Sequence, residues 1–448
     1  MLLSLGSICC VIIWVIVGTS YTKLHPFWVL FSAALLMAFL LGLDVLITTQ
    51  YVVVGFWKAL KSVGLLILFG TFIGAALELS SGAISLAKGV LKLLHRLPLP
   101  YAISFIGYLV SIPVFCDAAF VILSQLNKTI SKQTKVSLKG LTVALSTGLF
   151  APHVLIPPTP GPLVAAANLE VDNLFLLILV GSVLAFILVV VGGVYGHYII
   201  KKDRPEIYTT PLNFAQDFTQ KESPTPNFYR ALTPILVPIV LMTLGAIVPH
   251  IGEETLMTKV VDFVTMPVTA LAVGALLSLR LNTTRHGGFF LRVLKKGALQ
   301  AFPIVMITCM GGALATVIQT IPLEDYVLHI STFTGLGILI PFAIAALLKT
   351  AQGSSTIAII TTSSIILPLL PLLNLDSEMG KVWAIMALGV GSMTVSHAND
   401  SYFWVVAQMS GMNVKEAYRT HTVGTLLQGV VGLILVYLGH SLWSAYYV

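Results

Sequence analysis

Long stretches without an ionised side chain constrain the fold of this chain more than any other feature. Asp, Glu, Lys and Arg are absent from residues 173–200, 297–323 and 420–448. Each stretch exceeds the ~18 apolar residues that indicate a membrane-spanning helix. Only 10% of all residues are charged and 57% are hydrophobic, whereas soluble domains carry about 25% charged residues. The length then predicts an all-α polytopic membrane protein with about 10–12 transmembrane helices and no separate soluble domain.

The basic residues indicate orientation rather than a binding partner. A net charge of +7 would suggest nucleic acid in a soluble chain, but here the basic residues gather in short loops. Five lie in 201–230 and five in 280–296. Two helices separate these loops, so both lie on one side of the membrane. The positive-inside rule assigns that side to the cytoplasm.

Three charged residues are isolated inside apolar sequence. Asp117 is the only charged residue between Leu97 and Asn127; Lys349 and Asp400 are equally alone in 326–375 and 382–414. An ionised group at membrane depth costs roughly 2.5–3.5 kcal/mol on insertion scales, so it is normally kept for a function. We therefore expect functional roles for all three.

Each isolated charge lies near residues that interrupt a helix. Residues 152–162 contain five prolines, which predict an extended segment because proline lacks an N–H donor and clashes with the preceding turn. The Gly353–Thr356 segment combines a glycine with three hydroxyls, and Ser396–Asp400 is a dense polar run. Irregular backbone at membrane depth survives only when it is buried in protein or lines a wet cavity. The interruptions therefore predict one polar site inside the bilayer.

The residue types favour an anionic substrate. Lys349, the hydroxyls of the following segment and the backbone at 157–162 could bind a carboxylate, and Asn399 with neighbouring hydroxyls could bind the hydroxyl groups of a substrate. The predicted substrate-binding residues are Thr159, Gly161, Lys349, Ser354, Ser355, Thr356, His397 and Asn399. A snorkelling lysine with locally satisfied hydroxyls is the alternative.

Three side chains are candidates for carrying protons: Asp117, His397 and Asp400. Imidazole titrates near neutrality, and burial can move a carboxylate into the same range. Sodium held by Asn399, Asp400 and backbone carbonyls is the alternative coupling ion. A structural role for His397 is equally compatible with the sequence.

The chain also repeats its plan. Helix interruptions near 111–127 and 152–162 are followed, about 240 residues later, by interruptions near 350–372 and 396–402. Paired broken segments are typical of transporter binding sites. We expect a first half at 1–200, a cytoplasmic linker at 201–230 and a second half at 231–448, inverted relative to each other. Two generic helical regions without a repeat are the alternative.

These motifs resemble the gluconate permease family, the gluconate:proton symporters of bacterial inner membranes. The resemblance covers essentially the whole chain, and the segments that carry it are 115–120, 157–162, 353–356 and 396–400 with Phe403-Trp404. It implies inverted repeats with re-entrant hairpins and an elevator-type architecture. Asp117, Thr159, Lys349 and Ser401-Tyr402 depart from the gluconate carriers, which leaves the exact substrate open.

Together these features predict a proton-coupled symporter for a small hydroxylated monocarboxylate such as gluconate, in the bacterial inner membrane. D-serine, glycerate and sodium coupling are the alternatives. No metalloprotease or serine-hydrolase motif is present, so we expect no enzyme, no cofactor and no metal. The expected partners are the substrate, protons and the lipid bilayer; a homodimer is left open, and nucleic acid is not expected.

Overall fold

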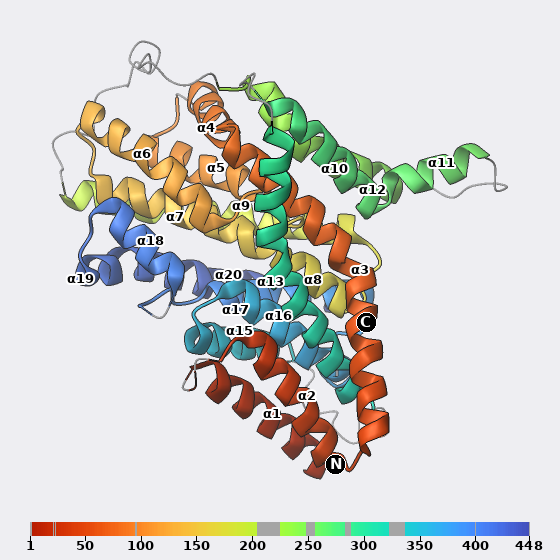
Figure 1. Cartoon of the computed structure of the whole chain (residues 1–448). Helices are drawn as coiled ribbons and strands as arrows, with labels where there is room; N and C mark the ends of the chain where they lie inside the picture. Colours follow the sequence, from red (N-terminus) through yellow and green to blue (C-terminus); the bar gives the residue numbers. More distant parts are fainter. Residues whose placement is uncertain are drawn as a thin grey trace.

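The computed structural model describes residues 2–20, 22, 24–94, 96–203, 225–247, 256–282, 288–321, 337–398 and 400–447 (Figure 1). These residues form helices and contain no β-strand. The helices up to the central loop are α1 (Leu2–Ser20), α2 (Pro26–Leu40), α3 (Val45–Leu79), α4 (Gly82–Leu93), α5 (Leu99–Ser111), α6 (Cys116–Thr134), α7 (Leu138–Leu155), α8 (Pro160–Asn168) and α9 (Leu174–Asp203). The predicted all-α class is confirmed.

The helices after the central loop are α10 (Phe228–Ile247), α11 (Leu256–Thr265), α12 (Pro267–Ser278), α13 (Phe289–Ile318), α15 (Leu339–Gln352), α16 (Ser355–Ile366), α17 (Glu378–Met393), α18 (Ser401–Ser410), α19 (Val414–Ala417) and α20 (Val423–Tyr447). Three single turns of 3-10 helix are η2 (Leu279–Leu281), η4 (Leu367–Leu369) and η5 (Pro371–Leu373), and one π-helical turn is η6 (Tyr418–Thr422). The predicted linker at 201–230 lies mostly outside the described residues, since 204–224 are not among them.

Six helical segments of the described residues are long and apolar enough to cross a membrane: 45–79, 138–168, 174–203, 228–245, 289–318 and 414–445. Helices α11 and α12, bent by 63° at their junction, can form a seventh span. The remaining apolar helices have 10–17 residues. Fewer long spans are found than the predicted 10–12 because breaks divide much of the apolar sequence into helices too short to cross alone.

The two long helices α3 and α13 lie side by side along the molecule (Figure 1). They touch where glycines allow close approach: a Cβ atom on Gly55 would lie 2.5 Å from the carbonyl oxygen of Gly312. Small residues at helix crossings are typical of membrane proteins, where packing replaces the hydrophobic effect. An ion pair between Glu78 and Lys296 joins the same two helices 23 residues further along α3.

Helix α7 forms the centre of the molecule. Every residue from Gly140 to Leu155 is buried. A Cβ atom on Gly148 would lie 2.3 Å from the carbonyl oxygen of Ser104 on α5, and one on Gly140 would lie 2.7 Å from that of Gly196 on α9. α7 is therefore packed tightly between α5 and α9.

Helix breaks occur at all four predicted places. They lie at 112–115 between α5 and α6, at 156–159 between α7 and α8, at 353–354 between α15 and α16, and at 394–400 between α17 and α18. Gly353 supplies the sharp turn of the third break, with a φ of +75° that favours glycine. Its N–H donates to the carbonyl of Lys349 (2.8 Å), which closes the end of α15.

The prediction of an extended chain over all of 152–162 is wrong at both ends. Pro152 lies inside α7, and only 156–159 are non-helical. Pro152 costs α7 only the hydrogen bond of its own missing N–H, and the helix ends three residues later at Leu155. At the other side, Pro160 begins α8, and proline is tolerated in a first turn because the N–H groups there have no helical partner.

Candidate functional site

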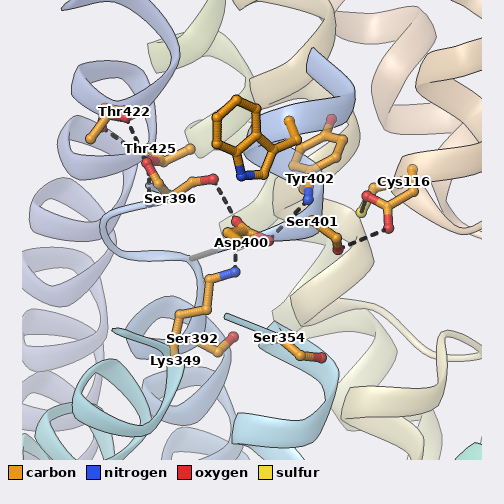
Figure 2. A network of polar contacts seen from close by, with 12 residues as sticks. Cys116, Lys349, Ser354, Ser392, Ser396, Asp400, Ser401, Tyr402, Thr422 and Thr425 are labelled. Carbon is orange, nitrogen blue, oxygen red and sulfur yellow. Dashed lines mark hydrogen bonds and ion pairs between the residues drawn. The ribbon is translucent and has the colours of Figure 1, made fainter. Parts of the chain in front are cut away.

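Asp400 is fixed at the start of α18. Its Oδ1 accepts from the backbone N–H of Tyr402 (3.0 Å), as an N-cap carboxylate does. Its Oδ2 accepts from the hydroxyl of Ser396 (2.5 Å). The Ser396 backbone is held in turn by the hydroxyls of Thr422 and Thr425 (Figure 2). The break at 394–400 is thus a defined loop tied to the helix that follows.

Lys349 forms an ion pair with Asp400 in the interior. The distance from Nζ to Oδ2 is 2.7 Å, and the two side chains are 1% and 3% exposed. Nζ also lies 5.6 Å from the ring centroid of Phe150. A pair this deeply buried pays a large desolvation cost for its charges. Two of the three isolated charges of the sequence are therefore partners.

A cavity of about 310 Å³ lies next to this ion pair. The predicted site residues on its wall are Asp117, Ser354, Ser355, Thr356 and Asp400. The remaining lining residues come from the same breaks and from neighbouring helices: His25, Phe115, Cys116, Phe150, His153, Gly353, Pro303, Ile304, Ile307, Ile357, Ile360, Ser401 and Tyr402. Its volume is at the lower end of the ~300–1,000 Å³ typical of small-molecule sites.

Three helices begin at this cavity. α6 starts at Cys116, α16 at Ser355 and α18 at Ser401, and each of these residues lines the wall. A helix N-terminus carries roughly half a positive charge and free N–H donors, so it attracts anions. The three helix N-termini contribute a positive electrostatic potential to the cavity, and the carboxylates of Asp117 and Asp400 oppose it.

Polar contacts join the walls across the cavity. The hydroxyl of Ser401 on α18 donates to Oδ2 of Asp117 on α6 at a long 3.5 Å. Nε2 of His153 on α7 lies 3.4 Å from the hydroxyl of Thr356 on α16. These weak contacts span elements that are far apart in sequence, so a ligand could replace them at small cost.

The other predicted residues that the structure describes lie outside the cavity wall. Thr159 is buried and its hydroxyl donates to the carbonyl of Ile156 (2.5 Å), behind His153. Gly161 faces Ile359, which a Cβ atom would meet at 3.0 Å. His397 is half-buried in the 394–400 loop, and Asn399 lies outside the described residues.

Sequence reasoning missed His421. It is fully buried in the π-helical turn η6, and its two ring nitrogens contact Ser146 and Ser396. The sequence contained a signal, an ionisable residue inside the uncharged stretch 420–448, that we did not weigh. Tyr402 was also missed: it is 2% exposed and donates to the carbonyl of Ser146 (2.9 Å).

Comparison with known proteins agrees with this architecture. Residues 2–442 match the GntP family permeases. The chain belongs to the GntP permease family. It is 32% identical to an uncharacterised permease of Haemophilus influenzae, over 94% of this chain and 89% of that protein.

Two further relatives carry transport names. The chain is 28% identical to a gluconate permease of Pseudomonas aeruginosa, over 95% of both chains. It is 27% identical to the D-serine transporter DsdX of Escherichia coli K12, over 92% of both. Because the family and these relatives are permeases, this GntP-family protein is a multi-pass membrane transporter and not an enzyme.

Among solved structures, the YdaH transporter of Alcanivorax borkumensis is similar with a TM-score of 0.65 at 14% identity, over 94% of this chain and 99% of that one. The likeness concerns the fold. That structure was described as having an unusual topology.

Proposed function

We propose that this GntP-family permease is a symporter that imports a small hydroxylated monocarboxylate, such as gluconate or a related sugar acid, together with protons. The observation that carries the proposal is the convergence of three helix N-termini on a cavity backed by the Lys349–Asp400 ion pair. An anion is favoured at such N-termini, and the names of the relatives in the family agree with this substrate class.

In this proposal the substrate carboxylate lies against the N-terminus of α16 and accepts from the hydroxyls of Ser354, Ser355 and Thr356. Substrate hydroxyls bind His153, Ser401 and, beyond the described residues, Asn399. Thr159 and Gly161 lie behind the cavity wall and act indirectly, through the 156–159 break that supports His153. His397 supports the same loop as Asp400. Because these side chains can form hydrogen bonds with substrate hydroxyls, we expect a hydroxy acid to bind more tightly than a fatty acid.

Proton coupling follows from the competition for Lys349. While Asp400 is ionised, it holds the lysine at 2.7 Å, and the cation is not available to a substrate. A proton on Asp400 removes that attraction and leaves a buried cation in need of an anion. The substrate carboxylate meets that need, so proton and anion bind together. Asp117, at the N-terminus of α6, is the neighbouring proton-carrying candidate.

The energetics depend on stoichiometry. One proton with one monoanion moves no net charge, so only the pH gradient contributes, at about 1.4 kcal/mol per pH unit. A second proton, held by Asp117, would add about 2.3 kcal/mol per 100 mV of membrane potential. The dependence of accumulation on membrane potential therefore shows how many protons are transported with each substrate anion.

Vesicles with imposed gradients test the proposal. We expect accumulation of labelled gluconate, or of another sugar acid from a panel that includes D-serine and glycerate, when the outside is acidified. Accumulation driven by sodium at equal pH would contradict proton coupling. Accumulation of D-serine alone would favour the amino-acid alternative that one relative's name suggests.

The variant Asp400→Asn tests the coupling step. An amide cannot ionise, so Lys349 stays without its buried counter-charge in every state. We expect Asp400→Asn to lose proton-driven accumulation, while exchange of labelled for unlabelled substrate continues. Normal proton-driven uptake in this variant would contradict the role of Asp400, and Lys58→Met, on an exposed ion pair, is the control.

We also propose that 1–200 and 231–448 are two related halves joined by the linker at 201–230, in a bacterial inner membrane. Each half contributes two breaks in the same order, with the breaks at 112–115 and 353–354 preceding those at 156–159 and 394–400. Broken helices in corresponding positions of two halves are typical of alternating-access transporters.

A further inference from the structure

His421 is a buried imidazole that the binding site itself does not use. It is fully buried in the π-helical turn η6, which interrupts the chain between α19 and α20. Its Nδ1 lies 3.0 Å from the hydroxyl oxygen of Ser146, and its Nε2 lies 3.1 Å from that of Ser396. Ionisable groups inside membrane segments are commonly functional, and π-helical turns occur frequently at functional sites.

Ser396 connects this imidazole to Asp400. Its hydroxyl oxygen lies 2.5 Å from Oδ2 of Asp400 and 3.1 Å from Nε2 of His421 (the serine and aspartate are drawn in Figure 2). One hydroxyl therefore contacts both titratable groups. A proton can pass between Asp400 and His421 through Ser396 without any rearrangement of the backbone.

The transfer uses the tautomer of His421 that carries its proton on Nδ1. In this tautomer Nδ1–H donates to Ser146, whose own proton donates to the carbonyl of Val143, 3.2 Å away, and the lone pair of Nε2 faces Ser396. When Asp400 is ionised, the single proton of Ser396 donates to the carboxylate. When Asp400 is protonated, Asp400 donates to Ser396 and Ser396 donates to Nε2.

The charged and titratable groups around His421 are few. The 394–400 loop contributes Asp400, with Lys349 of α15 behind it. α18 contributes Tyr402, whose ring centroid lies 5.3 Å from that of His421. α7 contributes Ser146 at the contact and Lys139 two turns away, paired with Glu416 of α19 at 2.7 Å. Arg419 is exposed in the same turn, and its carbonyl accepts from Tyr195 of α9.

We propose that His421 receives the transported proton from Asp400 through Ser396, which deepens the proton coupling proposed above and rests on it. The carboxyl proton moves to Ser396 Oγ, the Ser396 proton moves to Nε2, and the products are an Asp400 carboxylate and an imidazolium. Both ring N–H groups of the imidazolium then donate, to Ser396 and to Ser146. No proton is lost or gained in the step.

This transfer restores the resting ion pair. The regenerated carboxylate of Asp400 pairs with Lys349 again, so the substrate carboxylate no longer has a cationic partner. His421 contacts α7 at Ser146, between the cavity residue His153 and the start of the helix. At that start Ser137 donates to Asp203 (2.7 Å), next to the basic loop predicted to be cytoplasmic. The proton therefore moves from the cavity toward the side on which it has to be released.

The test compares His421→Gln with Ser396→Ala in vesicles. Glutamine can donate and accept hydrogen bonds but does not titrate at neutral pH, and alanine removes the bridging hydroxyl while both titratable side chains remain. In His421→Gln we expect exchange of labelled for unlabelled substrate to continue, because His421 does not line the cavity. Proton uptake with substrate, followed by a pH-sensitive dye, should fall at least about ten-fold in both variants, as expected when a positioned proton-transfer group is removed.

His440→Gln is the matched control, on the helix α20 that follows the turn of His421 but away from Asp400, and it should behave like the wild type. Wild-type proton uptake by His421→Gln or by Ser396→Ala would overturn the proposed relay. Loss of exchange together with proton uptake in His421→Gln would show a structural role and also overturn it. If the wild type itself takes up no proton with any substrate, the proposed symport fails, and this is seen before any variant is compared.

Discussion

The carboxylate of Asp400 is bound by three different parts of the chain. Tyr402 contributes a backbone N–H, Ser396 a hydroxyl and Lys349 an ammonium group. A buried ion pair adds little to stability, because desolvation offsets the attraction, but removal of one partner leaves an uncompensated charge. Such a pair is therefore suited to a switch that a proton and an anion operate together.

Removal of one partner affects the free energy of unfolding differently for buried and for exposed ion pairs, and this difference gives a prediction. In Lys349→Met the Asp400 carboxylate stays buried without its cation, so we expect a loss of about 3–5 kcal/mol. The double variant Lys349→Met/Asp400→Asn removes both charges and should regain most of that loss without regaining proton-driven uptake. Thermal unfolding of the purified protein in detergent measures both.

The control for this prediction is Lys58→Met. Its ion pair with Glu170 is open to solvent, with side chains 62% and 51% exposed, and exposed pairs contribute about 0–1 kcal/mol. Equal stability of Lys349→Met and Lys58→Met would contradict the interpretation of the buried pair.

The sequence identified the three isolated charges but not their relation. Asp117, Lys349 and Asp400 stand out because ionised groups are rare in apolar sequence. We assigned Lys349 to the substrate and Asp400 to the proton separately, since a contact between residues 349 and 400 depends on how α15 and α18 pack. His421 was missed for a related reason: neutral histidine does not interrupt an uncharged stretch, and its two serine partners lie on other elements.

At the scale of elements, the breaks were more predictable than the helices around them. Gly353 and the residues near Asp400 mark their breaks through local chemistry, a positive φ and an N-cap. Pro152 misled the prediction, because the one hydrogen bond lost with its missing N–H does not by itself end a helix. Among the described residues, few of the apolar segments form one long spanning helix each, since apolar composition does not distinguish a long helix from a short one that ends inside the protein.

The crossing of α3 and α13 provides a prediction at this scale. A Cβ atom on Gly55 would lie 2.5 Å from both the carbonyl oxygen of Gly312 and the hydroxyl oxygen of Thr316. Gly55→Ala should force the helices apart and cost about 1–3 kcal/mol, as overpacking does. Thermal unfolding in detergent is the measurement.

Gly64 on the same helix is the matched control. Its nearest neighbour would be a side-chain atom of Leu60, 3.1 Å away on α3 itself. Gly64→Ala should therefore be neutral, or gain about 0.5–1 kcal/mol of helix stability. If the two alanine variants unfold at the same temperature, the close crossing does not stabilise the fold.

At the scale of the whole molecule, two ion pairs on α3 are separated by about the thickness of a bilayer's hydrocarbon core. Lys58 pairs with Glu170, and Glu78 pairs with Lys296. The 20 residues between Lys58 and Glu78 span about 30 Å of helix at 1.5 Å per residue, which is the thickness of a bilayer's hydrocarbon core. The Glu78 end is next to the basic helix start of α13, the side that the positive-inside rule assigns to the cytoplasm.

This orientation predicts which sites react from which side. Single cysteines at Lys202 and Arg292, both exposed, should react with a membrane-impermeant maleimide in inside-out vesicles, whereas one at the exposed Glu170 should react in right-side-out vesicles. The 30 residues of α9 separate Glu170 from Lys202 by about 45 Å, enough to cross the bilayer. The unsubstituted chain gives the background from its native cysteines. Reaction of Glu170→Cys and Lys202→Cys from the same side would place both ends of α9 on one face, and would contradict the spanning arrangement on which the path of the proton depends.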